Sequence, residues 1–294
     1  MKRALFLIVV ASLVAACGGG PRPSASAAAG AINVITTTTV FADLVKQVGG
    51  DRVTVHSLVP KGGEVHTFDP APSDAVAVSG ADLLVLNGLG LDDWLLSFAQ
   101  QAGAANVPVL QLAPNLDEVA YIDDNPHLWL NPAYAKIYVD RIRLKLIEID
   151  AQGQQAYDAN AEAFAGRLDA LDTWAHQQMG AIPAELRRVV SFHDAFPYFA
   201  AAYDLGIVGV VVEAPGQDPS AVEVANLVNS IRQTGVKAIL SETHFSDELA
   251  QTIAAETGAK VVSDLYTDTL GDPPLDTYEA AIRYDVEQIT AVLR

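Results

Sequence analysis

Short apolar runs alternate with amphipathic stretches from about residue 31 to the end of the chain. Eight runs rich in valine, leucine, isoleucine and threonine predict β-strands, because they are short and are bounded by glycine, aspartate, proline or charged residues. They are INVITTTT, RVTVHSLV, DLLVLNG, VPVLQL, RRVVSF, GIVGVVVE, VKAILSE and AKVVSDL. Helical patterns such as LDDWLLSFAQQAG and SAVEVANLVNSIRQTG lie between them. Strands that alternate with helices predict an α/β protein with mainly parallel sheets.

The middle of the chain predicts one long helix. Between Gln155 and Met179 there is no proline and a single glycine, and apolar side chains recur at steps of three and four. A chain of 294 residues exceeds the usual size of one domain. We therefore expect two α/β lobes, residues 31–152 and 181–294, joined by a rigid linking helix over 153–180. On the pattern alone, this segment is also compatible with a surface helix of the second lobe.

The N-terminus has the features of a secretory signal. Lys2 and Arg3 precede the apolar run ALFLIVVASLVAA, which ends at Cys17, the only cysteine of the chain. The residues before Cys17 resemble a bacterial lipobox, which predicts a lipoprotein signal peptide over 1–17 and a lipid anchor on Cys17. An ordinary secretory signal with an incidental cysteine is the alternative. Residues 18–30 are small and low in complexity, so we expect a flexible tether there.

Composition narrows the possible partners. Hydrophobic residues make up 50% of the chain, which is enough for sizeable cores, and the formal net charge is −18. So acidic a protein is a poor nucleic-acid binder. We expect a monomer in an extracytoplasmic compartment, in the periplasm or on the cell surface, attached to a bacterial membrane by its acyl chains.

Four side chains suited to metal coordination occur in separate sequence contexts: His66, His127, His193 and Asp268. Three imidazoles and one carboxylate make a complete shell for an ion such as Zn²⁺. Three of the four follow predicted strands, at the sheet edge where open α/β folds place ligands. Each residue alone is more simply a hydrogen-bonded structural group, so the prediction of a metal site depends on the four together.

The surroundings of these residues add detail. Pro126 and Pro132 flank the His127 loop and should stiffen it, and Trp129 should help to exclude water. Asp69-Pro70, just after His66, predicts the start of a helix. Of the remaining histidines, only His244 is placed to approach the cleft. There it would contact the metal ligands without binding the metal itself. His56 falls inside a predicted strand, and His176 beside the apolar stripe of the long helix.

The motifs KGGEVHTFDP, NPHLWLNPAYA, FHDAFPYFAAAY and YTDTL, with the long helix between the second and third, resemble the substrate-binding lipoproteins of zinc and manganese ABC importers. The resemblance covers nearly the whole mature chain. It implies two lobes bridged by a rigid helix, with the metal buried between them. It further implies that His66 and His127 come from the first lobe and that His193 and Asp268 come from the second. An ABC permease in the membrane is the implied partner, and no catalysis is implied.

The sequence departs from this family in two places. The family commonly has Asp-Pro before its first ligand histidine, where this chain has Glu64-Val65, which can alter the loop. Many zinc-dedicated members carry a long histidine-rich acidic loop before the second ligand, whereas NLDEVAYIDDN is short and has no histidine. The third ligand position is a histidine, His193, where manganese-type members tend to have a carboxylate.

Several functional hypotheses follow. Three imidazoles and one carboxylate favour Zn²⁺, because Mn²⁺ prefers more oxygen ligands, so we expect a zinc receptor, with a manganese receptor as the alternative.

A zinc metallohydrolase would use the three histidines as ligands and Asp268 as general base. A receptor for a chelated metal or an organic solute would need a wide aromatic and arginine-lined pocket, and a second role as an adhesin stays open. We expect metal binding to weaken as the pH falls through the histidine range, because each imidazole must be neutral to coordinate.

Overall fold

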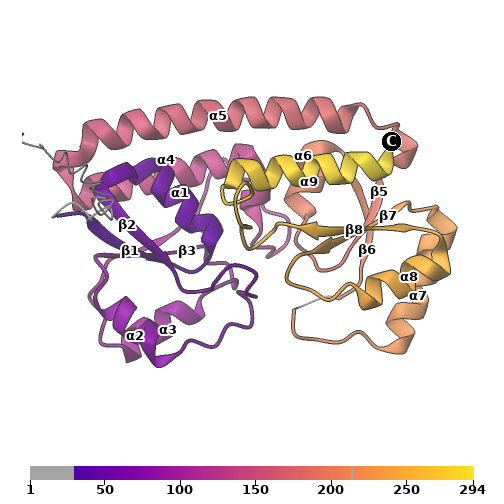
Figure 1. Ribbon diagram of the computed structural model, residues 1–294, viewed down its shortest axis with the longest axis horizontal. Coiled ribbons are helices and arrows are strands. Elements are labelled where there is room, and N and C mark those ends of the chain that lie inside the picture. Colours follow the sequence, from indigo (N-terminus) through magenta and orange to yellow (C-terminus); the bar gives the residue numbers. More distant parts are fainter. Residues whose placement is uncertain (1–29, 213–214) are drawn as a thin grey trace, which may run out of the picture.

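The computed structural model describes residues 30–212 and 215–294, so the predicted signal peptide, Cys17 and nearly all of the tether lie outside the described residues. The described chain forms two α/β lobes side by side (Figure 1). In the first lobe, four parallel strands pair in the order β2-β1-β3-β4. Their bounds are β1 Ile32–Thr36, β2 Val53–Ser57, β3 Leu83–Leu86 and β4 Val109–Gln111.

The second lobe repeats this topology. Its parallel strands pair in the order β6-β5-β7-β8. They are β5 Arg188–Ser191, β6 Gly206–Val210, β7 Ala238–Glu242 and β8 Lys260–Leu265. All eight strands lie within the apolar runs of the sequence, which confirms the predicted α/β class with parallel sheets.

Helices cover both faces of each sheet. The first lobe contains α1 Thr39–Gly49, α2 Pro72–Ser79, α3 Trp94–Gln101 and α4 Pro132–Ile149, and the second contains α6 Pro197–Tyr203, α7 Ala221–Thr234, α8 Glu248–Thr257 and α9 Tyr278–Leu293. Side chains of α2 and α3 form a separate cluster on one face of the first sheet, and those of α7 and α8 do so on the second. Figure 1 shows these four helices on the side of the molecule opposite to α5.

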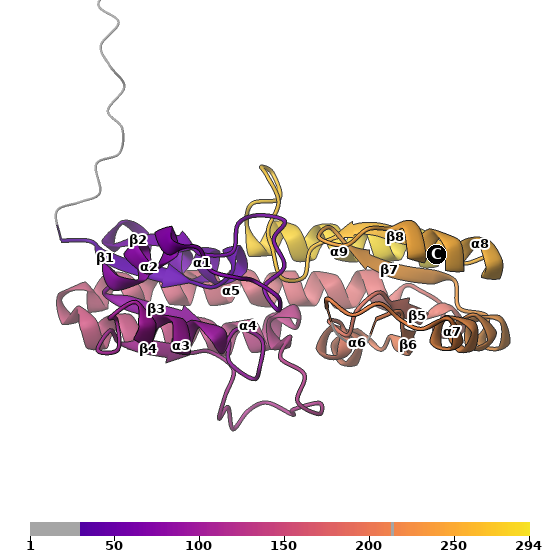
Figure 2. The same ribbon diagram turned by 90° about the horizontal axis from the view of Figure 1, so that it is seen from below.

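The long helix α5 spans Gln154–Gly180 and crosses both lobes (Figures 1 and 2). Its buried stripe is the one visible in the sequence, and consists of Tyr157, Ala161, Phe164, Leu168, Leu171, Ala175 and Met179. The helix packs on α1 and α4 of the first lobe and on α6 and α9 of the second. It is therefore a shared support of both lobes rather than a surface helix of the second lobe.

One apolar core continues from the first lobe along α5 into the second. Hydrogen bonds also join the lobes: the indole of Trp129 donates to Thr267 O over 2.9 Å, and the Tyr278 hydroxyl donates to Trp129 O over 2.6 Å. Because buried apolar contacts and buried hydrogen bonds must both break if the lobes separate, only small relative movements are expected. In the described part of the chain, no helix is long and apolar enough to cross a bilayer.

The start of α2 differs from the sequence prediction. The helix begins at Pro72, not at Asp69-Pro70. Ala71 is extended, with φ −82° and ψ 163°, because a residue before proline disfavours the helical region. Its amide donates to the side chain of Asp74, 2.8 Å away, which caps the helix instead. The loop that carries His66 is consequently longer than predicted.

Candidate metal centre

The four predicted metal-site residues lie together between the lobes. His66 is in the loop after β2, and His127 directly precedes a short 3-10 helix, Leu128–Leu130, in the loop after β4. His193 follows β5, and Asp268 follows β8. All four loops leave the C-terminal ends of parallel strands, where α/β folds bind ligands. Each lobe thus contributes two of the four residues.

The distances within this cluster suit a single ion. One nitrogen from each histidine and one carboxylate oxygen of Asp268 all lie within 4.8 Å of one another. The Asp268 oxygens are 3.7 Å from His66 Nε2, 3.6 Å from His127 Nε2 and 3.9 Å from His193 Nε2. Donors about 2.0–2.2 Å from a tetrahedral ion stand about 3.3–3.6 Å apart, so small adjustments bring all four onto one ion.

Residues behind His127 hold it in place. Its Nδ1 is 3.1 Å from Asn125 Oδ1, which also accepts a hydrogen bond from the His127 backbone amide. This contact leaves Nε2 directed at the cluster. The buried ring of Trp129 packs against the imidazole with centroids 5.2 Å apart, as expected from their proximity in the sequence. An acceptor on the remote nitrogen fixes the tautomer and ring orientation that coordination needs.

His193 has a corresponding carboxylate behind it. Its Nδ1 lies 3.0 Å from Glu242 Oε1, at the end of β7, while its Nε2 faces His127 Nε2 at 3.4 Å. Glu242 is 1% exposed. A carboxylate on the remote nitrogen of a histidine raises the basicity of the nitrogen that faces a metal.

Two further residues complete the cluster. His244 was expected only to approach it from behind, but its Nε2 is 4.0 Å from Asp268 Oδ2 and 3.4 Å from Glu64 Oε2. In the sequence, Glu64 stands out only as a departure from the family motif. Its spacing of two residues from His66 was the available signal, because the loop can then direct both side chains to one point. His56, in contrast, is exposed on β2, and the His176 side chain is 54% exposed on α5.

Burial keeps two of the histidines neutral. It lowers the pKa of His66 to about 3, and the charge on His193 acts in the same direction. It also lowers the pKa of His127 well below the ordinary value, with the same help from His193. These two imidazoles therefore require no deprotonation before coordination at any pH near neutrality.

The other two residues take up protons more readily. Burial alone lowers the pKa of His193, but Glu242, followed by Asp268 and Glu64, outweighs this effect and raises it to about 9. Burial raises the pKa of Asp268 to about 7; His193 opposes this rise, and the Glu64 and Glu242 charges add to it. We expected every imidazole to lose a proton before it binds the metal. The pKa values instead indicate that protons compete with the metal at His193 and Asp268, and not at His66 or His127.

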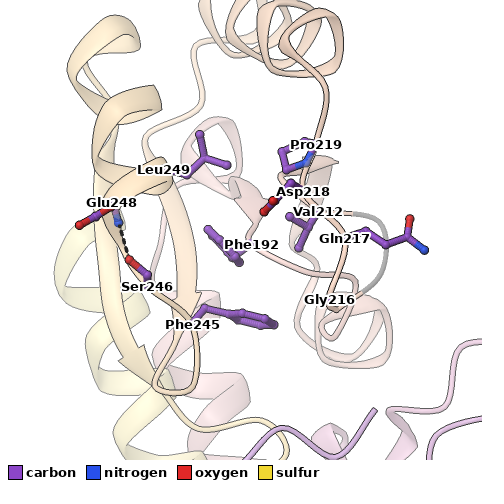
Figure 3. Close-up of a pocket in the computed structure, with 10 residues that line it drawn as sticks. All are labelled: Phe192, Val212, Gly216, Gln217, Asp218, Pro219, Phe245, Ser246, Glu248 and Leu249. Carbon is purple, nitrogen blue, oxygen red and sulfur yellow. Dashed lines mark hydrogen bonds between the residues drawn. The ribbon is translucent and has the colours of Figure 1, made fainter. Parts of the chain in front are cut away.

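A cavity of about 420 Å³ lies beside the cluster in the second lobe. Figure 3 shows the rings of Phe192 and Phe245 on one side of it and Pro219 on another. The Phe245 ring packs on His244 and His193, with centroids 4.3 and 5.2 Å away, and so separates the cavity from the cluster. No arginine or lysine is among its described lining residues. The cavity thus lacks the cationic lining predicted for a chelate receptor.

Comparison with known proteins identifies the family. Residues 34–292 match the family model described as zinc-uptake complex component A, periplasmic. The manganese-binding lipoprotein MntA of Halalkalibacterium halodurans is 30% identical over 293 residues, which cover 98% of this chain and 97% of the relative. The iron-binding protein YfeA of Yersinia pestis is 31% identical over 294 residues, which cover 97% and 94%.

Solved structures agree on the fold. A crystal structure of ZnuA superimposes with a TM-score of 0.79 at 28% identity, covering 90% of this chain and all of the other. A manganese-bound periplasmic metal-binding protein from Candidatus Liberibacter asiaticus gives a TM-score of 0.78 at 24% identity, with the same coverage. The chain belongs to the family of zinc-uptake complex component A, a family of extracytoplasmic metal-binding receptors of ABC transporters and not of enzymes.

Proposed function

We propose that this chain is a Zn²⁺ receptor that captures the ion through His66, His127, His193 and Asp268 and delivers it to an ABC importer permease. The observation that carries the proposal is the convergence of these four side chains from both lobes. The metal-facing atoms His66 Nε2, Asp268 Oδ1 and Asp268 Oδ2 are buried and have no hydrogen-bond partner among the described residues. Unpaired buried polar atoms are costly, and a bound cation satisfies them.

The donor set favours zinc over manganese. Three imidazole nitrogens and one carboxylate match the borderline character of Zn²⁺, whereas Mn²⁺ prefers more oxygen donors. Relatives named for manganese and iron show that the family serves several metals. The nearby Glu64 carboxylate favours a manganese receptor instead, because it offers an additional oxygen donor.

The burial of the site determines how release must occur. His127, His193 and Asp268 are each no more than 2% exposed. Since two ligands come from each lobe, moving the lobes slightly apart breaks the coordination shell and opens a route to solvent. A permease that binds the loaded shape and separates the lobes would therefore release the ion.

We propose that the protein acts as a monomer anchored to the membrane through Cys17.

Competition between metals tests this proposal. Residues 31–294, which contain every described helix and strand, are stripped of metal, offered Zn²⁺ and Mn²⁺ together at limiting protein, dialysed and analysed for both elements. We expect one tightly held equivalent of zinc and no manganese. One equivalent of manganese would make the chain a manganese receptor, and a protein free of both metals would refute the four-residue site.

Replacing Asn125 by alanine is expected to weaken Zn²⁺ binding by about 10–100-fold, because an outer partner of a metal-bound histidine contributes on that scale. The substitution removes the acceptor at His127 Nδ1 but leaves all four proposed ligands. Competition with a chromogenic chelator measures the dissociation constant. Asp124→Ala, an exposed position in the same loop, is the matched control and should leave it unchanged. Equal affinities in the two variants would show that Asn125 does not position His127.

A further inference from the structure

His244 is a buried imidazole that the four-residue site does not use. It lies just after β7, and its side chain is 1% exposed. Neither ring nitrogen has a hydrogen-bond partner among the described residues. The rings of Phe245 and His193 pack against it, with centroids 4.3 and 5.9 Å away, so its direction is fixed. A buried imidazole that is held in place without protein partners is available to bind a ligand.

Two carboxylates face this ring. Glu64 Oε2 is 3.4 Å from His244 Nε2, and Asp268 Oδ2 is 4.0 Å from it. The second oxygen of Glu64, Oε1, accepts a hydrogen bond of 2.7 Å from the His66 amide, which orients the carboxylate. Glu64 Oε2 and both Asp268 oxygens, like His244 Nε2, have no hydrogen-bond partner in the described chain. Atoms from both lobes therefore converge on a second point beside the first site.

The chemistry of this point is that of a cation site. Donors about 2.0–2.2 Å from a tetrahedral ion stand about 3.3–3.6 Å apart. The 3.4 Å between His244 and Glu64 falls within this range, and the 4.0 Å between His244 and Asp268 requires a small adjustment. The carboxylates of Glu64 and Asp268 bring negative charge into a buried cluster whenever they ionise, and buried negative charge is unfavourable unless a cation or a proton compensates it. Within the described residues, Glu64, Glu242 and Asp268 form close pairs only with histidines, not with lysine or arginine.

We propose that Glu64, His244 and Asp268 form a second divalent-metal position that shares the Asp268 carboxylate with the first. This inference rests on the proposed function, because Asp268 is also a ligand there. The second ion binds more weakly, since it has three protein ligands and is repelled by its neighbour across a shared carboxylate.

The position of Glu64 suggests what the second site does. The side chains of Glu64 and His66 are 19% and 18% exposed, whereas those of His127, His193, His244 and Asp268 are at most 3% exposed. An incoming ion therefore reaches the cluster from the side of Glu64 and His66. The second position is then a staging site, at which an ion sheds water before it moves to the three-histidine site.

Counting bound ions tests the proposal. The metal-free mature protein is titrated with Zn²⁺ and analysed by native mass spectrometry. We expect one ion at limiting zinc and two at excess. His244→Ala should hold one ion at the same excess, and so should Glu64→Gln, which keeps the side-chain volume and provides a second test if the first variant folds poorly. His56→Ala, which removes an exposed histidine on β2, is the matched control and should hold two.

The outcomes separate the two proposals. A wild-type protein that stops at one ion in excess zinc would overturn the second position and leave the first intact. Two ions in both the His244→Ala and Glu64→Gln variants would show that the second ion binds elsewhere, which would also overturn it. No bound ion at limiting zinc would instead refute the four-residue site itself.

Discussion

Replacing His193 by alanine is expected to weaken Zn²⁺ binding by about 1,000-fold or more, which corresponds to about 4 kcal/mol of binding free energy. The change removes one of four proposed ligands and leaves Glu242 buried without the imidazole that faces it at 3.0 Å. It therefore costs more than the loss of an outer partner such as Asn125. Competition with chelators of graded affinity measures the dissociation constants of both proteins.

The fold must persist for this result to bear on coordination. Far-UV circular dichroism and thermal unfolding of the metal-free variant test this, and His193→Gln keeps a polar side chain near Glu242 if the alanine variant unfolds. His56→Ala is the control for loss of a histidine away from the cluster. An unchanged zinc affinity in a folded His193 variant would remove His193 from the coordination shell.

Lowering the pH from 7 to 5 is expected to weaken Zn²⁺ binding by about 5,000-fold. In the metal-free protein, the pKa of His193 is raised to about 9 and that of Asp268 to about 7, so zinc must displace protons from both as the pH falls. His193 accounts for about 100-fold of the loss and Asp268 for about 50-fold. His66, with its pKa lowered to about 3, and His127 stay neutral over this range and add nothing.

Isothermal titration calorimetry checks this proton count directly. At pH 7, zinc binding should release about 1.5 protons, one from His193 and half of one from Asp268, which titrations in buffers of different ionisation enthalpy reveal. Asn125→Ala is a suitable control, because it should lower the affinity without changing the slope against pH. A dissociation constant that is flat between pH 7 and 5 would contradict the proposed ligand set.

Most of the fold could be predicted from local patterns in the sequence. The eight strands and the stripe of α5 follow from the spacing of apolar residues, which depends on neighbours a few positions away. Two long helices, α4 and α9, were not singled out, although both lie within the predicted lobes. The start of α2 was placed too early because Asp69-Pro70 resembles a helix start, while Pro72 forces the preceding residue to stay extended.

The candidate site was predictable only in part. His66, His127, His193 and Asp268 occur in recognisable motifs, so the sequence suggested them as a set. The sequence could not show that Glu64 reaches His244 across the two lobes, nor that Glu242 supports His193, because these contacts depend on how three separate loops meet. The pKa values of the cluster residues likewise could not be predicted from the sequence, because they arise from burial and from charges distant in sequence.

Anomalous X-ray diffraction from crystals of the protein loaded with one equivalent of zinc tests the central claim most directly. We predict one strong zinc peak between the lobes, about 2.0–2.2 Å from a nitrogen of each of His66, His127 and His193 and from an oxygen of Asp268. A zinc ion that lacks a bond to one or more of these four residues would contradict the account. A principal zinc peak outside the inter-lobe cluster would also contradict it.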